Sequence, residues 1–118
     1  DTLPYNAHTT TSDALRMGLP VLTCIGNSFA SRVAASLLNA VNLPELITIN
    51  QEQYESLAIE LATNPEKLKI IKDKLVSNLS TAPLYNTPLF TRHLESAYSM
   101  MYDRYQRGLD PDHIYVKH

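Results

Sequence analysis

The chain has 118 residues, of which 44% are hydrophobic, and its ten Lys and Arg against twelve Asp and Glu give a formal net charge of −2. This charge provides no general attraction to nucleic acid or to anionic lipid, so a bound phosphate would have to be held by local groups. No apolar run approaches the ~20 residues that a bilayer-spanning helix needs, and we expect neither a nucleic acid nor a membrane as a partner.

Helices and strands alternate in the N-terminal part of the chain. A short helix is predicted over residues 11–17, opened by a capping pattern at 10–13. Residues 21–24 and 46–49 have the apolar character of buried strands, and the apolar spacing between them predicts a helix over 28–41. Because parallel strands need crossover helices, this order indicates an α/β layer with two short parallel strands. Two strands are too few for a whole sheet, so we expect the others in a larger protein.

The C-terminal half is predicted to be helical. Helices are expected over residues 51–63, 65–79 and 87–107, the first of them opened by Asn50, and the tail over 110–118 is expected to be docked or frayed. The last helix carries apolar and aromatic residues along one side: Phe90, Leu94, Ala97, Tyr98, Met101, Tyr102 and Tyr105. Such a face is more typical of core or interdomain packing than of a ligand site.

The first residues and the single cysteine bear on the context of the chain. Asp1 leads directly into a turn-like segment over residues 3–6, without an initiating Met, a signal peptide or a transit segment, which indicates a boundary inside a larger protein. Cys24 is the only cysteine, which excludes an internal disulfide and fits a reducing compartment, so we expect a cytoplasmic protein. Its apolar neighbours favour a buried strand residue over a nucleophile.

A polar segment from Asn6 to Asp13 crowds the predicted start of the first helix. A helix N-terminus presents unpaired backbone N–H groups and about half a positive charge, so it can hold a diphosphate without Lys or Arg. Threonine hydroxyls add donors, and His8 could donate to a phosphate oxygen or stabilise charge on a leaving nucleoside diphosphate. Asp13, one turn into the helix, is better suited to accept hydrogen bonds from ribose hydroxyls.

A simpler interpretation of the same segment is structural. Thr10 and Asp13 would then only cap the helix, and His8 would be a partly buried residue in a turn. Taken alone, the spacing of these residues favours this interpretation, because the segment is not a glycine-rich phosphate loop and the whole chain has three glycines.

Six stretches, read in order, form a wider pattern: YNAHTTTSDAL at 5–15, GLPVLT at 18–23, FASRVAASLL at 29–38, LPELI at 43–47, PLYNT at 83–87 and PDH at 111–113. Together they resemble the C-terminal catalytic region of the O-linked N-acetylglucosamine transferase family over essentially the whole chain. The resemblance implies a two-lobed glycosyltransferase of the GT-B type, usually with tetratricopeptide repeats ahead of the catalytic region. Residues 1–118 would be the C-terminal part of its donor-binding lobe, with a partial Rossmann-like fold.

The resemblance also implies roles for individual residues. His8, Thr9 and Thr10 match positions that contact the donor diphosphate, and Asp13 matches the position that binds the ribose. His8 is also the candidate catalytic residue, because its imidazole could stabilise charge on the leaving diphosphate. The family's diphosphate-binding lysine, most groups that contact the base and the acceptor-side groups would lie before Asp1. The chain alone is therefore expected to bind a nucleotide sugar and to transfer none.

The resemblance favours a UDP-sugar donor, UDP-GlcNAc above all, and serine or threonine of a protein acceptor. A plant-like branch of the family transfers fucose from GDP-fucose and typically lacks the histidine and aspartate that stand here as His8 and Asp13. Short side chains at Thr11 and Ser12 differ from animal members and look closer to bacterial-type ones. An alternative from another class is a non-catalytic interaction module that presents its helical face to a partner.

Neither a cofactor nor a metal is expected. The four histidines, His8, His93, His113 and His118, lack the paired spacing of zinc ligands. The expected partners are the nucleotide-sugar donor, the protein acceptor, and the upstream lobe and tetratricopeptide repeats of the same protein. An unpaired edge of the incomplete sheet would also favour self-association.

Overall fold

The computed structural model describes residues 1–117, so His118, one of the four histidines considered above, lies outside the described residues. Two compact units are present, residues 1–85 and the chain from Asn86 onward. In chain order the helices, strands and 3-10 turns are α1 (Thr9–Arg16), β1 (Thr23–Cys24), η1 (Phe29–Ser31), α2 (Val33–Ala40), η2 (Pro44–Leu46), β2 (Ile47–Thr48), α3 (Gln51–Thr63), α4 (Pro65–Leu79), η3 (Pro83–Tyr85) and α5 (Thr87–Gln106).

The predicted α/β layer with two short parallel strands is confirmed. β1 pairs with β2 in parallel, with Thr23 opposite Ile47, and α2 lies between the strands in the sequence as the crossover helix. The Thr48 hydroxyl donates to the Thr23 carbonyl oxygen at 2.8 Å, which adds a side-chain bond to the ladder. In the described part of the chain the sheet has these two strands alone, so each strand has one edge that pairs with no other strand.

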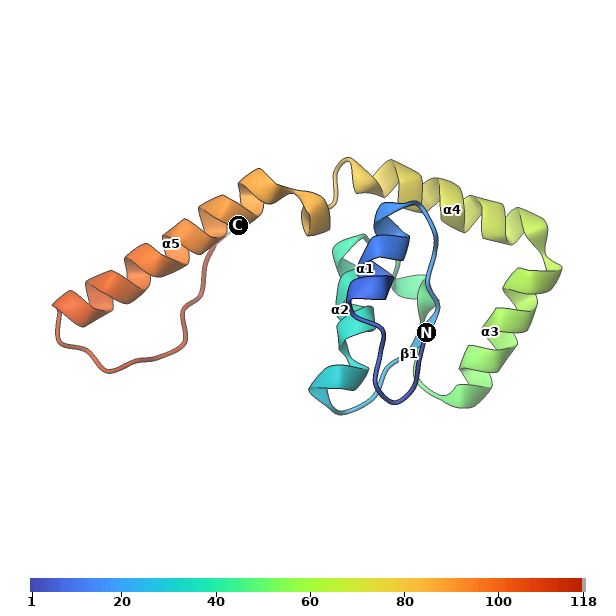
Figure 1. Ribbon diagram of the computed structural model, residues 1–118, viewed down its shortest axis with the longest axis horizontal. Coiled ribbons are helices and arrows are strands. Elements are labelled where there is room, and N and C mark those ends of the chain that lie inside the picture. The colour runs from blue at the N-terminus through green and yellow to red at the C-terminus, as the bar shows by residue number, and fades with distance from the viewer. Residues whose placement is uncertain (118) are drawn as a thin grey trace. The chain divides into compact units, whose positions relative to one another are not determined.

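The hydrophobic core of the first unit holds α1 firmly in place. Leucines from three helices meet there with no exposed surface: Leu15 of α1, Leu38 of α2 and Leu75 of α4. In Figure 1, α1 and α2 run side by side, and α4 crosses close to one end of α1. Burial of a leucine side chain contributes about 1.5–3 kcal/mol, so these contacts fix the direction in which the N-terminus of α1 points.

The helix predicted over residues 28–41 is broken, because Ser28 caps a separate 3-10 turn. The Ser28 side chain accepts from the Ser31 N–H at 3.3 Å, while the Ser31 hydroxyl oxygen accepts from the Ser28 N–H at 3.0 Å. This reciprocal capping box opens η1 as a separate turn, and Arg32, with φ −120° and ψ −9°, leaves helical geometry before α2 begins. The apolar spacing remained helical through the break, so periodicity alone could not locate it.

The helical C-terminal half is confirmed. Asn50 caps α3 as predicted, its side chain accepting from the Gln53 N–H at 2.8 Å, and the Asn64 side chain caps α4 through the Lys67 N–H at 3.2 Å. The bounds of α3 and α4 match the prediction, and α5 ends one residue earlier than predicted. None of the helices among residues 1–117 is long and apolar enough to cross a membrane.

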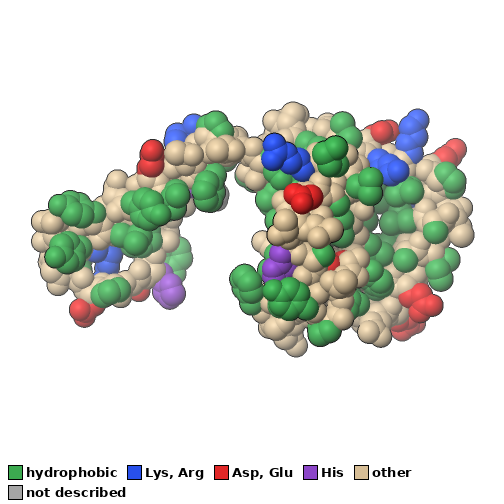
Figure 2. Space-filling view, in the orientation of Figure 1, with side chains coloured by type: hydrophobic (Ala, Val, Ile, Leu, Met, Phe, Trp, Pro, Cys, Tyr) green, Lys and Arg blue, Asp and Glu red, His purple; other side chains and the backbone are tan. Residues whose placement is uncertain are grey.

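The second unit consists of α5 and the tail that follows it. No residue of α5 is buried, and its predicted apolar face is exposed, with Tyr98 at 58% and Tyr102 at 65%. Figure 2 shows the corresponding hydrophobic side chains gathered over this helix. The packing expected of this face therefore does not take place within α5 and its own tail.

Candidate functional site

The candidate site residues lie at the N-terminus of α1, which begins at Thr9 and not at Thr11 as the sequence predicted. Its first helical hydrogen bond runs from the Ser12 N–H to the His8 carbonyl oxygen at 3.0 Å, so the amides of residues 9–11 precede the ladder. His8 occupies the capping position but its side chain makes no capping bond, and the first turn holds no acidic residue. These amides and the helix dipole leave a partial positive charge without a counter-charge from the first turn.

This geometry contradicts one part of the simpler interpretation of the segment, whereas the half-buried His8 before the helix agrees with its other part. Thr10 and Asp13 were expected to cap the helix under that interpretation, yet both lie inside α1 and neither caps it. Thr9, Thr10 and Asp13 are exposed, whereas Thr11 is 1% exposed. Thr11 Oγ1 has no hydrogen-bond partner within the described residues. Thr11 therefore faces the interior of the unit as part of the first turn of α1. Thr9 and Thr10, in the same turn, face outward.

His8 is half-buried and held by three neighbours. Its ring stacks on Tyr5 with centroids 4.9 Å apart and an interplanar angle of 20°, and the centroid of the nearly perpendicular Phe29 ring lies 6.3 Å away. Its Nε2 lies 3.4 Å from the Ala30 carbonyl oxygen, within reach of a hydrogen bond from the tautomer that carries the proton there. The sequence singled out His8 but missed Tyr5 and Phe29 as its neighbours, because Phe29 lies 21 positions away and no local pattern joins them.

A cavity of ≈ 370 Å³ lies at the carboxyl end of β1, in the same unit. Its lining includes Leu3 and Pro4 from the segment before α1, Cys24 from β1 and Gly26 after it. Cys24 lies in the predicted strand but is half-buried and not buried, because it faces this cavity. Ligands of open α/β sheets bind beyond the carboxyl ends of their strands, so this edge is the expected side for a ligand.

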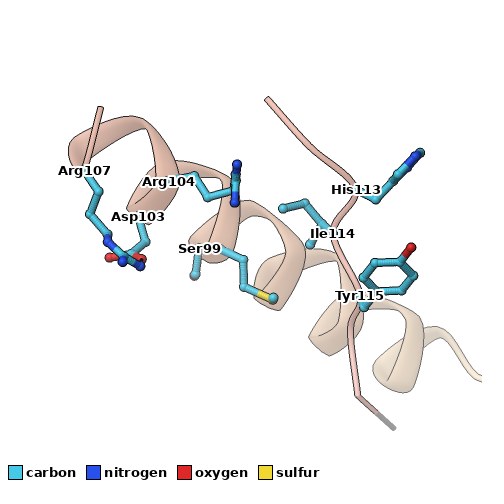
Figure 3. Close-up of a pocket in the computed structure, with 8 residues that line it drawn as sticks. Ser99, Asp103, Arg104, Arg107, His113, Ile114 and Tyr115 are labelled. Atoms are coloured by element: carbon cyan, nitrogen blue, oxygen red, sulfur yellow. Dashed lines mark ion pairs between the residues drawn. The ribbon is translucent and has the colours of Figure 1, made fainter. Parts of the chain in front are cut away.

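The second unit has a cavity of ≈ 500 Å³ between α5 and its tail. Figure 3 shows Arg104 and Arg107 on the helix with His113 and Tyr115 on the tail. Arg107 pairs with Asp103 at 3.5 Å, and the Arg104 guanidinium donates to the Asp110 carbonyl oxygen. Because both guanidinium groups already have partners within this unit, the cavity is a weaker candidate for a phosphate than the start of α1.

No metal centre was found in residues 1–117: nowhere do three or more His, Cys, Asp or Glu side chains gather closely enough to hold an ion. His8 and His113 lie in different units, and the ring contacts and hydrogen bond that the described residues make with His8 involve Tyr5, Phe29 and the Ala30 carbonyl oxygen. The chemistry available at the start of α1 is therefore that of backbone amides, hydroxyl groups, one imidazole and one carboxylate.

Comparison with known proteins finds one family and a set of similar enzymes. Glycosyl transferase family 41 matches residues 1–94. The barley (Hordeum vulgare) protein named "Probable UDP-N-acetylglucosamine--peptide N-acetylglucosaminyltransferase SPINDLY" is 39% identical over 111 residues, which cover 94% of this chain and 12% of that protein. The Caenorhabditis elegans "UDP-N-acetylglucosamine--peptide N-acetylglucosaminyltransferase" is 34% identical over 114 residues, which cover 97% of this chain and 10% of that protein.

A solved structure shares the fold. A Thermobaculum terrenum O-GlcNAc transferase mutant superimposes with a TM-score of 0.79 at 37% identity, over 86% of this chain and 20% of that one. The chain thus spans about a tenth of the curated relatives and a fifth of the solved structure. The similarity reaches the segments on either side of the start of α1, since the family match begins at the first residue.

Proposed function

The chain belongs to glycosyl transferase family 41, and from this premise we propose that residues 1–118 form the C-terminal part of the donor-binding lobe of a protein O-glycosyltransferase. The whole protein would transfer a sugar from a UDP-sugar to serine or threonine of an acceptor protein. Names of the relatives support this donor, because they refer to UDP-N-acetylglucosamine and a peptide. The upstream lobe, tetratricopeptide repeats and a cytoplasmic location belong to the same proposal.

The observation that carries this proposal is the uncapped start of α1. Residues 9–11 offer three amides that precede the helical ladder, and the first turn has no carboxylate to compete with a diphosphate. We assign the donor diphosphate to His8, Thr9 and Thr10, whose positions border these amides. Anion binding at a helix N-terminus needs no lysine or arginine, which fits the absence of both from residues 1–15.

His8 and Asp13 are assigned different roles in this proposal. During transfer, the bond between the anomeric carbon and the diphosphate oxygen breaks, and negative charge grows on the departing oxygen. An imidazole N–H beside that oxygen would interact most strongly in the transition state. Asp13 is exposed on the next turn, where its carboxylate would accept hydrogen bonds from ribose hydroxyls, whose charge does not change.

The identity of the donor and the branch of the family follow from side chains in the same segment. His8 and Asp13 are both present, which favours a UDP-sugar, and UDP-GlcNAc in particular, over GDP-fucose. The short side chains of Thr11 and Ser12 support a bacterial-type member. We propose no metal and no cofactor beyond the sugar donor.

UDP is expected to bind the chain weakly and at the start of α1. In an NMR titration with millimolar UDP, we expect the largest shifts at the amides of Thr9 and Thr10 and a smaller shift at Asp13. Affinity should be low because the proposal places a diphosphate-binding lysine and the base pocket outside residues 1–118, and a hydrogen bond to a charged group contributes about 1.5–3 kcal/mol. The exposed Thr91 in the first turns of α5 serves as the control amide. Shifts in α5 with none at Thr9, Thr10 and Asp13 would contradict the site.

The isolated chain is also expected to self-associate through the sheet edge. Each strand has one edge that pairs with no strand in the described part of the chain, and such an edge can pair with a second molecule. Light scattering after size exclusion should show mass rising with concentration. A lysine at Ile49, which follows β2 and is 69% exposed, should lower that mass.

The matched variant for this experiment lies on α5. Tyr98→Gln with Tyr102→Gln removes two exposed rings from its apolar face without touching the sheet. If this variant abolished association while Ile49→Lys left it intact, the sheet edge would not be the contact. That result would favour the second candidate function, an interaction module working through α5, for which the exposed aromatic face is the observation.

A further inference from the structure

We propose that the Asp1 carboxylate is a positioning residue, which ties the segment carrying His8 to the sheet and thereby sets the orientation of the His8 imidazole at the start of α1. This inference rests on the proposed function in one respect, since it assigns a consequence for sugar transfer. Its structural part stands on the contacts of Asp1 alone. Neither the spacing of the sequence nor the expected site residues pointed to Asp1.

Asp1 uses both oxygens of its carboxylate. Oδ1 accepts the backbone N–H of Ala7 at 2.8 Å, and Oδ2 accepts the hydroxyl of Thr23 at 2.6 Å. Oδ1 also accepts the N–H of Thr2 at 2.8 Å, which orients the carboxylate locally. Ala7 immediately precedes His8, so a single side chain links the amide one residue before His8 to strand β1.

The sheet end of this bridge is rigid. Thr23 is fully buried, pairs with Ile47 across the sheet, and its carbonyl oxygen accepts the Thr48 hydroxyl at 2.8 Å. Asp1 Oδ2 is the recorded partner of the Thr23 hydroxyl, and the Tyr54 hydroxyl of α3 donates to the Asp1 carbonyl oxygen at 3.3 Å. Asp1 is therefore held by β1 and α3, and its hydrogen bond to the Ala7 N–H fixes the position of Ala7 relative to them.

The other end of the bridge needs this support because residues 2–5 are exposed. Besides the contacts of Asp1, the Asn6 N–H anchors this segment to the rest of the unit by donating to the Ala30 carbonyl oxygen at 2.9 Å. The same oxygen lies 3.4 Å from His8 Nε2. Loss of the Asp1 carboxylate would leave the segment attached at Asn6 but would free the Ala7 amide, so the Asn6–Ala7 peptide, one residue before His8, could rotate.

Core packing would survive that loss. The buried cluster is built from residues of α1, α2, α3, α4 and the connections between them, and none of residues 1–8 belongs to it. An effect of Asp1 on transfer is therefore separable from an effect on folding. A hydrogen bond that orients a reacting group acts on the rate, because small displacements of such a group lower the population of reactive geometry.

The test uses the full-length protein with Asp1→Ala, Thr23→Val and the double variant, and Asp73→Ala on the exposed surface of α4 as the matched control. With UDP-GlcNAc and a protein acceptor, each single variant should lower kcat about tenfold with little change in donor KM. Because both changes break one bridge, the double variant should be no slower than the slower single variant. Thr23→Ser keeps the hydroxyl and should restore kcat to near the unmodified value.

Hydrogen exchange of the full-length protein, followed by mass spectrometry on peptides covering residues 2–10, gives a readout independent of transfer. Exchange at Ala7 should accelerate in Asp1→Ala and in Thr23→Val, and stay slow in Thr23→Ser and Asp73→Ala. Unchanged exchange, or additive losses of kcat in the double variant, would overturn the positioning role. If the unmodified protein transferred no sugar while the exchange pattern held, the proposed function would fail and the bridge would stand.

Discussion

Replacement of His8 by alanine in the full-length protein should lower kcat by about 10²-fold or more and change the donor KM far less, as expected for a donor to charge that develops in the transition state. The half-buried ring, its stack on Tyr5 and its approach to the Ala30 carbonyl oxygen hold the imidazole in a defined orientation. Steady-state kinetics with a UDP-sugar and a protein acceptor measure both parameters. The change should leave the fold intact, because His8 makes no part of the buried cluster.

Asp13→Ala is the matched comparison on the same helix. Hydrogen bonds to ribose hydroxyls contribute nearly equally to the ground state and the transition state, so this variant should raise the donor KM at nearly constant kcat. The Asp13 side chain is exposed and lies outside the buried cluster, so the comparison should not be confounded by stability. If His8→Ala changed only KM while Asp13→Ala changed only kcat, the two roles would have been assigned the wrong way round.

Gly26→Ala should destabilise the first unit by about 1–3 kcal/mol, the usual cost of forcing an extra carbon into a packed site. A Cβ at this position would stand 2.4 Å from Ser31 Oγ and 2.7 Å from Ser31 Cβ, which is closer than nonbonded atoms approach. Ser31 is 4% exposed and cannot move freely, because its hydroxyl group is part of the capping box with Ser28. Urea unfolding followed by circular dichroism measures the loss.

A double-mutant cycle isolates the close approach as the cause. Ser31→Gly removes both atoms that the new methyl group would meet, so Gly26→Ala should cost much less stability in that background than in the unmodified chain. Equal costs in both backgrounds would show that the steric explanation is wrong. Gly26→Ala should also displace the Ala30 carbonyl oxygen, because Ala30 belongs to η1. That oxygen contacts both the Asn6 N–H and His8 Nε2.

Much of this fold was predictable because its signals are local. Asn50 and Asn64 cap α3 and α4 through amides three residues ahead, and Pro65 stands at the first helical position, so both helices begin where the sequence indicates. Periodicity and the alternation of helix with strand were likewise enough to predict a parallel pair, although β1 and β2 are each shorter than the predicted apolar stretches. These features depend on residues within a turn or two of each other.

The candidate site shows the limit of such signals. The polar segment from residue 6 to 13 was identified from the sequence, but the start of α1 was placed two residues late. A run of threonines predicts a helix cap whether or not the helix has already begun, so it does not locate the first helical residue. The burial of Thr11 and Leu15 in the folded unit is what accompanies a start at Thr9. The break between η1 and α2 likewise escaped the apolar spacing, because it depends on the Ser28 cap and on the backbone angles of Arg32.

The sequence by itself determined the family pattern, the order of the elements and the residue types available to hold a diphosphate. Only the tertiary structure decided which of them face outward, that Tyr5 and Phe29 flank His8, and that Asp1 joins Ala7 to Thr23. The physical reason is distance along the chain. Asp1 and Thr23 are 22 positions apart, and their contact exists because packing of α1 and β1 in one unit brings them together, which no local spacing encodes.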